Sequence, residues 1–154
     1  PELNSTQIKS IVEKIGDRVE VIAHGLIQVM TMPHCPMAIV KNCKDSSACS
    51  SCRFSKGFFI RDPKEVDFLV ERRDEVSEVF NSFPIMWIDR IEELNIAGVN
   101  KFKLNLRESI EETIDVYKNA LLDEYYDEMQ IREELIGIYN NITYGHYNRG
   151  IING

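Results

Sequence analysis

The sequence predicts an α/β fold, with α+β as the alternative, on three observations. From Ile85 onward, strand-like and helix-like apolar patterns alternate along the chain, which is typical of α/β proteins. The middle third has instead the alternation and turn residues of a β-hairpin. Every cysteine of the chain lies between Cys35 and Cys52, which indicates a cysteine-rich metal loop next to the hairpin.

Each element is predicted from its local pattern. A helix over 4–15 begins with capping-box spacing between Asn4 and Gln7 and ends at Gly16. Lys101 to Leu106 alternates apolar and polar side chains, as a half-buried strand does. The remaining elements, in chain order, are strands over 19–24 and 26–30, the hairpin over 57–70, a short strand at 79–80, an apolar segment over 85–88, a helix capped by Asp89 and ending at Gly98, a long helix after Ser109 that bends near Tyr126, and an irregular tail.

Length and composition restrict the class of protein. A chain of 154 residues has room for one domain with a real core, so we expect a single domain or a fragment of a larger one. The chain starts without Met, which we interpret as a cut or processed end. We expect a cytoplasmic protein, because no export signal and no membrane-length apolar run is found. The net charge of −7 disfavours non-specific nucleic-acid binding, although basic residues gather around the cysteines.

The four cysteines have the spacing C-x7-C-x5-C-x2-C, at Cys35, Cys43, Cys49 and Cys52. A [4Fe–4S] cluster needs four thiolates and tolerates irregular spacing, so it is the first interpretation. Zinc is the alternative, although structural zinc sites usually have two C-x2–4-C pairs and only one is present. Disulfides and unrelated free thiols remain open behind these two. His34 adjoins Cys35 and is a candidate ligand or hydrogen-bond donor beside the centre.

Several segments together resemble the collagenase-like peptidases, the U32 peptidase family. The strand Val19–Gly25, followed ten residues later by Cys35, is similar to the signature region of that family. Phe80-Asn81-Ser82, Ala97-Gly98-Val99 and Phe102-Lys103-Leu104 also resemble its motifs, as does the ending from Thr143 to Gly150. Gln28, Ile22 and the run Lys103 to Arg107 depart from the family pattern, so the protein either lacks the acidic–basic pair of the best-known members or belongs to another subgroup.

The resemblance implies that the chain is the C-terminal part of a TIM-barrel-like protein with a β-hairpin insertion. Residues 1–34 would then hold the last barrel-type helix and strand, 35–56 the cysteine loop, and 57–154 the hairpin followed by strand and helix units. It also implies a protease with a [4Fe–4S] cluster on the four cysteines, acting on peptide or collagen-like substrates. The alternatives are an iron–sulfur protein that assists hydroxylation of RNA or a quinone precursor, and a non-catalytic, zinc-bound module that recruits substrate. We expect the N-terminal barrel portion of the same protein as a partner, and strand edges that favour a dimer.

Catalytic residues stay unknown from the sequence, since neither an H-E-x-x-H nor a G-x-S-x-G motif is found. Glu20 and His24 are candidates, because they lie four residues apart and we expect them on one face of a strand whose end could carry catalytic groups. His146 and Arg149, in the aromatic tail, are candidates for substrate binding.

Overall fold

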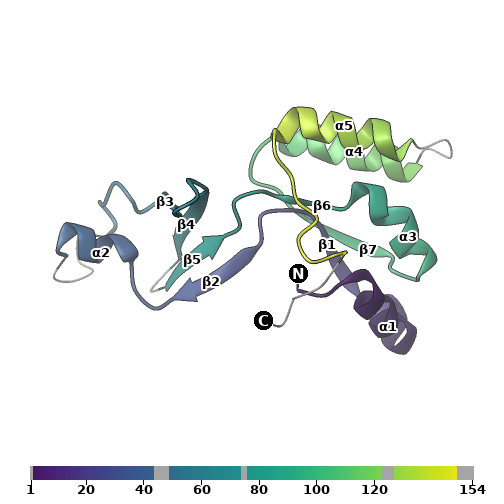
Figure 1. Cartoon of the computed structure of the whole chain (residues 1–154), viewed down its shortest axis with the longest axis horizontal. Coiled ribbons are helices and arrows are strands. Elements are labelled where there is room, and N and C mark those ends of the chain that lie inside the picture. Colours follow the sequence, from purple (N-terminus) through teal and green to yellow (C-terminus); the bar gives the residue numbers. More distant parts are fainter. Residues whose placement is uncertain (1, 44–48, 74–75, 123–126, 149–154) are drawn as a thin grey trace. The chain divides into compact units, whose positions relative to one another are not determined.

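The computed structural model describes residues 2–43, 49–73, 76–122 and 127–148 and contains both helices and strands, as the sequence predicts. The chain divides into two compact units. Unit 1 comprises Pro1–Leu26 and Phe83–Gly154, and unit 2 comprises Ile27–Ser82. The boundaries that we expected at residues 34 and 56 both fall inside unit 2. Figure 1 labels the elements of each unit.

Unit 1 is built on a three-stranded sheet in the order β6-β1-β7. Strand β1 is central, antiparallel to β6 and parallel to β7. Because α3 lies on the connection between β1 and β7, these elements form a βαβ unit, as in α/β proteins. A sheet of three strands is too small to show whether the protein has the barrel that the resemblance implies, so the barrel stays a prediction. The elements are α1 (Ser5–Ile15), the 3-10 turn η1 (Gly16–Arg18), β1 (Glu20–Gly25), β6 (Ile85–Met86), the 3-10 turn η2 (Ile88–Arg90), α3 (Ile91–Ile96), β7 (Lys101–Asn105), α4 (Ile110–Leu122) and α5 (Glu128–Tyr139).

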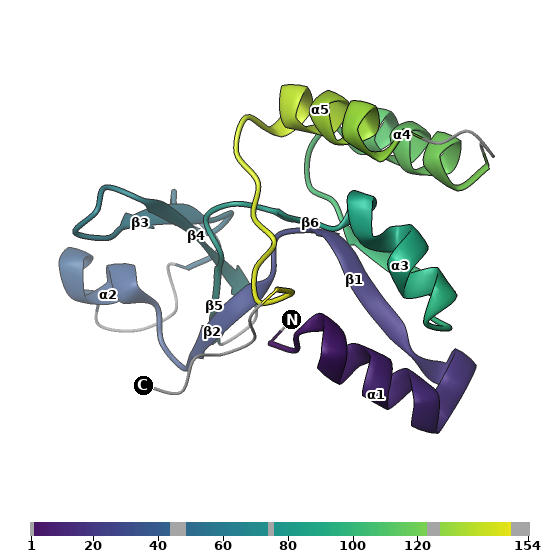
Figure 2. The same ribbon diagram turned by 45° about the vertical axis from the view of Figure 1, so that its right-hand side comes forward.

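The core of unit 1 lies between the sheet and the helices α4 and α5. Figures 1 and 2 show these two helices side by side along the sheet, with α1 on the opposite side of the strands. Phe102 and Leu104, the alternating residues of β7, pack against this core as predicted. Its buried members come from strands and helices alike: Ala23, Met86, Ile88, Ile91, Val116, Tyr117 and Leu135.

Helix starts show which sequence signals were reliable. The predicted capping box of α1 is confirmed, since the Asn4 side chain accepts from the Gln7 amide and Gln7 bonds back to Asn4. The predicted cap at Asp89 is wrong. Asp89 lies inside η2, and its carboxylate accepts a hydrogen bond from the hydroxyl of Tyr144. Because the Asp89 carboxylate binds Tyr144, it does not cap the amides of α3.

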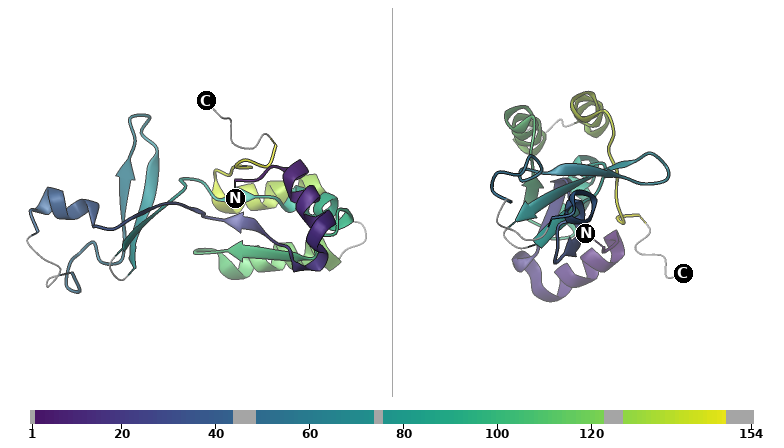
Figure 3. Two further views of the ribbon diagram at one scale, coloured as in Figure 1. Left: turned by 90° about the horizontal axis from the view of Figure 1, so that it is seen from below. Right: turned by 90° about the vertical axis from the view of Figure 1, so that its left-hand side faces the viewer.

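Unit 2 is a four-stranded antiparallel sheet in the order β2-β5-β4-β3. The hairpin β3–β4 is confirmed, and the short strand predicted at 79–80 is part of a longer strand, β5. Figure 3 gives two further views of these strands. The elements are β2 (Gln28–Met32), α2 (Pro36–Lys41), β3 (Phe58–Arg61), β4 (Asp67–Arg73) and β5 (Val76–Phe80).

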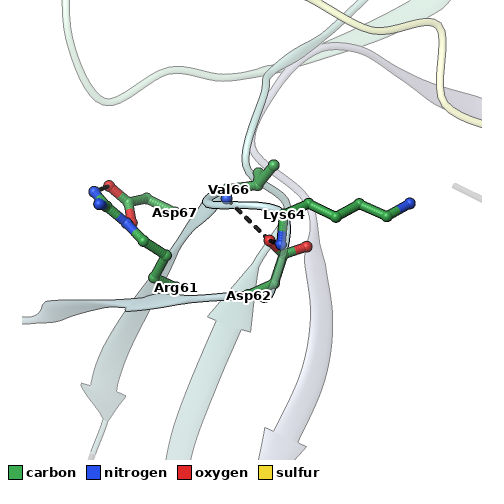
Figure 4. Close-up of polar contacts among 5 residues, drawn as sticks. All are labelled: Arg61, Asp62, Lys64, Val66 and Asp67. Carbon is green, nitrogen blue, oxygen red and sulfur yellow. Dashed lines mark hydrogen bonds and ion pairs between the residues drawn. The ribbon is translucent and has the colours of Figure 1, made fainter.

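The β3–β4 turn is organised by Asp62, as Figure 4 shows. One carboxylate oxygen of Asp62 accepts from the amides of Lys64 and Val66, at 2.7 and 2.9 Å. Arg61 and Asp67 face each other at the strand ends and form a bidentate ion pair, with Nε–Oδ1 and Nη2–Oδ2 distances of 2.7 and 2.8 Å. The turn of the predicted hairpin is therefore fixed by its own side chains.

None of the helices in the described part of the chain has the length and apolar character needed to cross a membrane.

Candidate functional site

The first two cysteines flank a short helix in the segment predicted as loop. Cys35 precedes α2 as its N-cap residue, and Pro36 occupies the first turn, where a missing amide hydrogen costs nothing. At the other end, Asn42 adopts the left-handed conformation with φ 52° and ψ 45°. The amides of Asn42 and Cys43 donate to Ile39 O and Ala38 O, at 3.3 and 2.9 Å, which is a Schellman motif. Backbone geometry thus fixes Cys35 and Cys43 at opposite ends of α2.

The other two cysteines share one tight turn. The amide of Cys52 donates to the carbonyl of Cys49 at 3.2 Å, and the amide of Ser55 donates to Cys52 O at 2.9 Å. Both cysteines are half-buried. The chain then enters β3 through Gly57, whose φ of 123° is open to glycine at little cost. Backbone hydrogen bonds thus hold the predicted C-x-x-C pair in one turn.

All four cysteines are free thiols, so the disulfide alternative is not realised in the structure. Within the described residues, no three His, Cys, Asp or Glu side chains lie close enough together to hold a metal ion. His34 is exposed. Four cysteine thiols are chemically suitable ligands for a metal centre. In this structure, however, they do not lie close enough together to form one.

The cations of this segment contact an aromatic ring. Lys41 Nζ lies 5.9 Å and the Arg53 guanidinium carbon 4.6 Å from the centre of the Phe54 ring. Phe54 packs edge-on against Phe58 of β3, with 5.7 Å between ring centres. Cation–π contacts of this kind place two positive charges over the face of one ring, directly after the C-x-x-C turn.

His24 is enclosed in the core of unit 1. Its side chain is fully buried, Nδ1 lies 3.1 Å from the Tyr117 hydroxyl, and the Tyr139 ring lies 4.7 Å away. The Tyr117 hydroxyl donates to Ala23 O at 3.2 Å, so Nδ1 carries the proton and donates to Tyr117. Burial lowers the pKa of His24 from 6.5 to about 4. His24 is therefore neutral, and it lies out of reach of a substrate.

Glu20 lies on the other face of β1. The pairing with β7 shifts by one residue between Ile22 and His24, so that Val21 faces Phe102 while His24 faces Leu104. This bulge places His24 on the face of Val21 and leaves Glu20, which is exposed, on the other face with the half-buried Ile22. The expectation that Glu20 and His24 share one face is therefore wrong. Glu20 instead borders a cavity of about 180 Å³ with apolar walls.

A polar cluster in unit 1 was missed from the sequence. The Tyr144 hydroxyl bonds to Asp89 and accepts from Arg132 Nε at 2.9 Å, while Arg90 lies over the Tyr144 ring at 5.5 Å. Asp89 is 8% exposed and has one oxygen without a partner. These residues come from η2, α5 and the tail, so no local spacing connects them. Of the two tail candidates, His146 is half-buried, and Arg149 lies outside the described residues.

A comparison with known protein families finds a match over almost the whole chain. The model of peptidase family U32 matches residues 1–153. Neither the curated proteins nor the solved structures contain a significant match to this chain.

Proposed function

The chain belongs to peptidase family U32, and from this premise we propose that it is the portion of a peptidase that carries a metal centre on Cys35, Cys43, Cys49 and Cys52. The observation that carries the proposal is the turn in which the Cys52 amide bonds to Cys49 O, because it brings a C-x-x-C pair together with both thiols free. Such a pair is the usual nucleus of a thiolate metal site.

A [4Fe–4S] cluster is the first choice for the centre, and zinc is the second. Only one C-x-x-C pair is present, whereas structural zinc sites usually have two. When bound, a cluster supplies one-electron transfer, and a zinc ion supplies a structural cross-link. His34, beside Cys35, is then placed to donate a hydrogen bond near the thiolates.

Peptide hydrolysis is assigned to the predicted barrel portion of the same protein. His24 is enclosed and neutral, and Glu20 faces the opposite side of the sheet, so these two residues do not form an acid–base pair. The proposal gives this chain the metal unit and leaves the hydrolytic groups elsewhere in the protein.

Anaerobic purification of the chain tests the metal centre. We expect a broad visible absorbance with bound iron and sulfide that bleaches in air and that is lost in the Cys49→Ser/Cys52→Ser variant. Colourless protein with one zinc per chain supports the second choice. Protein without either metal contradicts the proposal.

Gelatin cleavage by the full-length protein tests the hydrolytic part. Glu20→Gln is expected to leave the rate unchanged, because its candidate partner His24 is buried on the opposite face of the sheet. If Glu20→Gln loses most of the cleavage activity at normal thermal stability, Glu20 is a catalytic residue after all.

One observation favours a second function, the iron–sulfur protein that assists RNA modification. Lys41 and Arg53 flank the Phe54 ring, and a ring with nearby cations suits a base and its phosphates. RNA binding, measured by fluorescence anisotropy at several salt concentrations, should weaken in Arg53→Ala. The matched control is Arg18→Ala, which removes the same charge from unit 1. Equal effects of the two variants would point to net charge alone.

A further inference from the structure

The sheet of unit 2 has two edge strands, and they differ in regularity. The edge strand β2 carries a bulge, because its pairing with β5 shifts between Gln28 and Met30. The edge strand β3 pairs with β4 without interruption from Phe58 to Arg61, and within the described residues no strand of this sheet lies beyond it. Bulges are one of the features that keep an edge strand from pairing with another chain. The regular strand β3 is therefore the edge that remains open to such pairing.

The backbone groups on the outer side of β3 follow from its pairing with β4. The Asp62 amide donates to the Val66 carbonyl at 3.0 Å, in the same register as the strand pairs. In an antiparallel pair, residues that exchange hydrogen bonds alternate with residues that do not. Counted back from Asp62 in steps of two, every second residue of β3 bonds to β4. The residues between them, Phe59 and Arg61, point their amide and carbonyl groups away from β4.

The side chains along this edge do not block the approach of another strand. Phe59 is 67% exposed, and it lies on the same face of the sheet as Arg61, two residues later. Figure 4 shows Arg61 in its ion pair with Asp67 of β4, which balances the charge of the guanidinium group. Unpaired charges on an edge strand commonly prevent pairing with another chain, and here the charge is paired. The edge therefore presents an aromatic ring beside a cation that is already held in place.

We propose that β3 pairs antiparallel with β3 of a second copy of this chain, so that Phe59 lies opposite Arg61 of the second copy. In this register each outward group finds a partner. The Phe59 amide donates to the Arg61 carbonyl of the second copy, the Arg61 amide donates to its Phe59 carbonyl, and the two-fold axis repeats both bonds. Ile60 meets Ile60 of the second copy at the axis. This dimer is independent of the proposed metal centre.

The chemistry of the edge favours a second copy as its partner. Directly opposite side chains of an antiparallel pair lie close together, so each Arg61 guanidinium reaches the Phe59 ring of the other copy as a cation–π pair. A second copy supplies both halves of this pair twice. The strand has only four residues, so the dimer buries less than the roughly 1,200 Å² of a stable interface, and we expect a dissociation constant of about 10–100 µM. The net charge of −7 on each chain opposes association, so salt should strengthen it.

Sedimentation equilibrium of the chain tests the dimer, with a reductant that prevents links between cysteines. At about 0.15 M salt, concentrations of about 5–500 µM cover the expected constant. Two substitutions at the exposed Phe59 should act with opposite signs of charge. Phe59→Lys places a cation opposite Arg61 of the second copy and should weaken the dimer at least about ten-fold. Phe59→Glu places a carboxylate there and should keep the dissociation constant within about three-fold.

Met30→Lys is the matched control, because Met30 is 55% exposed on β2 and the change adds the same charge to the other edge of the sheet. It should leave the dimer unchanged. Amide exchange measured by NMR should show protection of Phe59 and Arg61 only at high concentration. A chain that stays monomeric at every concentration overturns the inference. So does a dimer that Met30→Lys weakens and Phe59→Lys does not, or one that Phe59→Lys and Phe59→Glu weaken equally.

Discussion

The Tyr117 hydroxyl connects two residues of the same strand: it lies 3.1 Å from His24 Nδ1 and donates to the Ala23 carbonyl at 3.2 Å. Both groups are buried at the bulge of β1, where the pairing with β7 shifts. The Tyr117 side chain of α4 therefore gives the buried His24 ring a hydrogen-bond partner and adds a second donor to Ala23 O, which also accepts from the Trp87 amide at 2.9 Å. Packing thus accounts for the His24 side chain in this strand motif, where His24 precedes Gly25.

Removal of this hydroxyl should destabilise unit 1. Tyr117→Phe leaves His24 Nδ1 buried without its partner, while Ala23 O keeps the hydrogen bond from the Trp87 amide at 2.9 Å, so we expect a loss of about 1–3 kcal/mol of unfolding free energy. Urea denaturation measures the loss. Tyr139→Phe is the matched control, because its hydroxyl bonds to Thr113 at a less buried place and should cost less. An equal or larger loss in the control contradicts the role given to Tyr117.

Burial of neutral His24 makes stability depend on pH. Burial lowers the pKa of His24 from 6.5 to about 4, so between these values the unfolded chain binds a proton that the folded chain does not. The stability from this group is therefore complete above pH 6.5 and decreases as the pH falls toward 4, by about 3 kcal/mol in all. Urea denaturation at pH 7.5 and 4.5 should show this loss in the wild type. In His24→Gln, the unfolding free energy should differ less between the two pH values than in the wild type. An equal difference would show that carboxylates, and not His24, cause the pH dependence of stability.

The sequence predicts the parts of this fold that depend on neighbours in the chain. The Asn4–Gln7 capping box, the alternation of Phe102 and Leu104, and the hairpin β3–β4 are all local, and all are found. The bulge between Ile22 and His24 depends on pairing with a distant strand, so the shared face of Glu20 and His24 was wrong. The pairing of Asp89 with Tyr144 crosses 55 residues and leaves no local pattern. The helix α2 was also missed, because the six residues after Cys35, five of them apolar, are too few to show a helical period.

The buried Asp89 should couple to Tyr144. Asp89→Asn weakens the bond from the Tyr144 hydroxyl and removes a negative charge that lies 3.8 and 3.9 Å from Arg90 and Arg132. Tyr144→Phe removes the same hydrogen bond from the other side. Each variant should lose about 1–2 kcal/mol, and the double variant should lose about 1 kcal/mol less than their sum. Thermal and urea unfolding of the four proteins measure the coupling, and strictly additive losses would show that the two side chains act independently.

Gly25 should be the least replaceable glycine described in unit 1. Its φ is 108°, and a Cβ atom at this position would lie 2.0 Å from the carbonyl oxygen of Asn105 on the neighbouring strand. Because backbone atoms cannot move aside without breaking the pairing of β1 and β7, Gly25→Ala should cost more than about 3 kcal/mol. Gly137→Ala is the matched control, since Gly137 lies within α5 with open space around it and should gain about 0.5–1 kcal/mol. Chemical denaturation of both variants checks the opposite signs, and a mild effect at Gly25 would mean that the two strands can separate there at little cost.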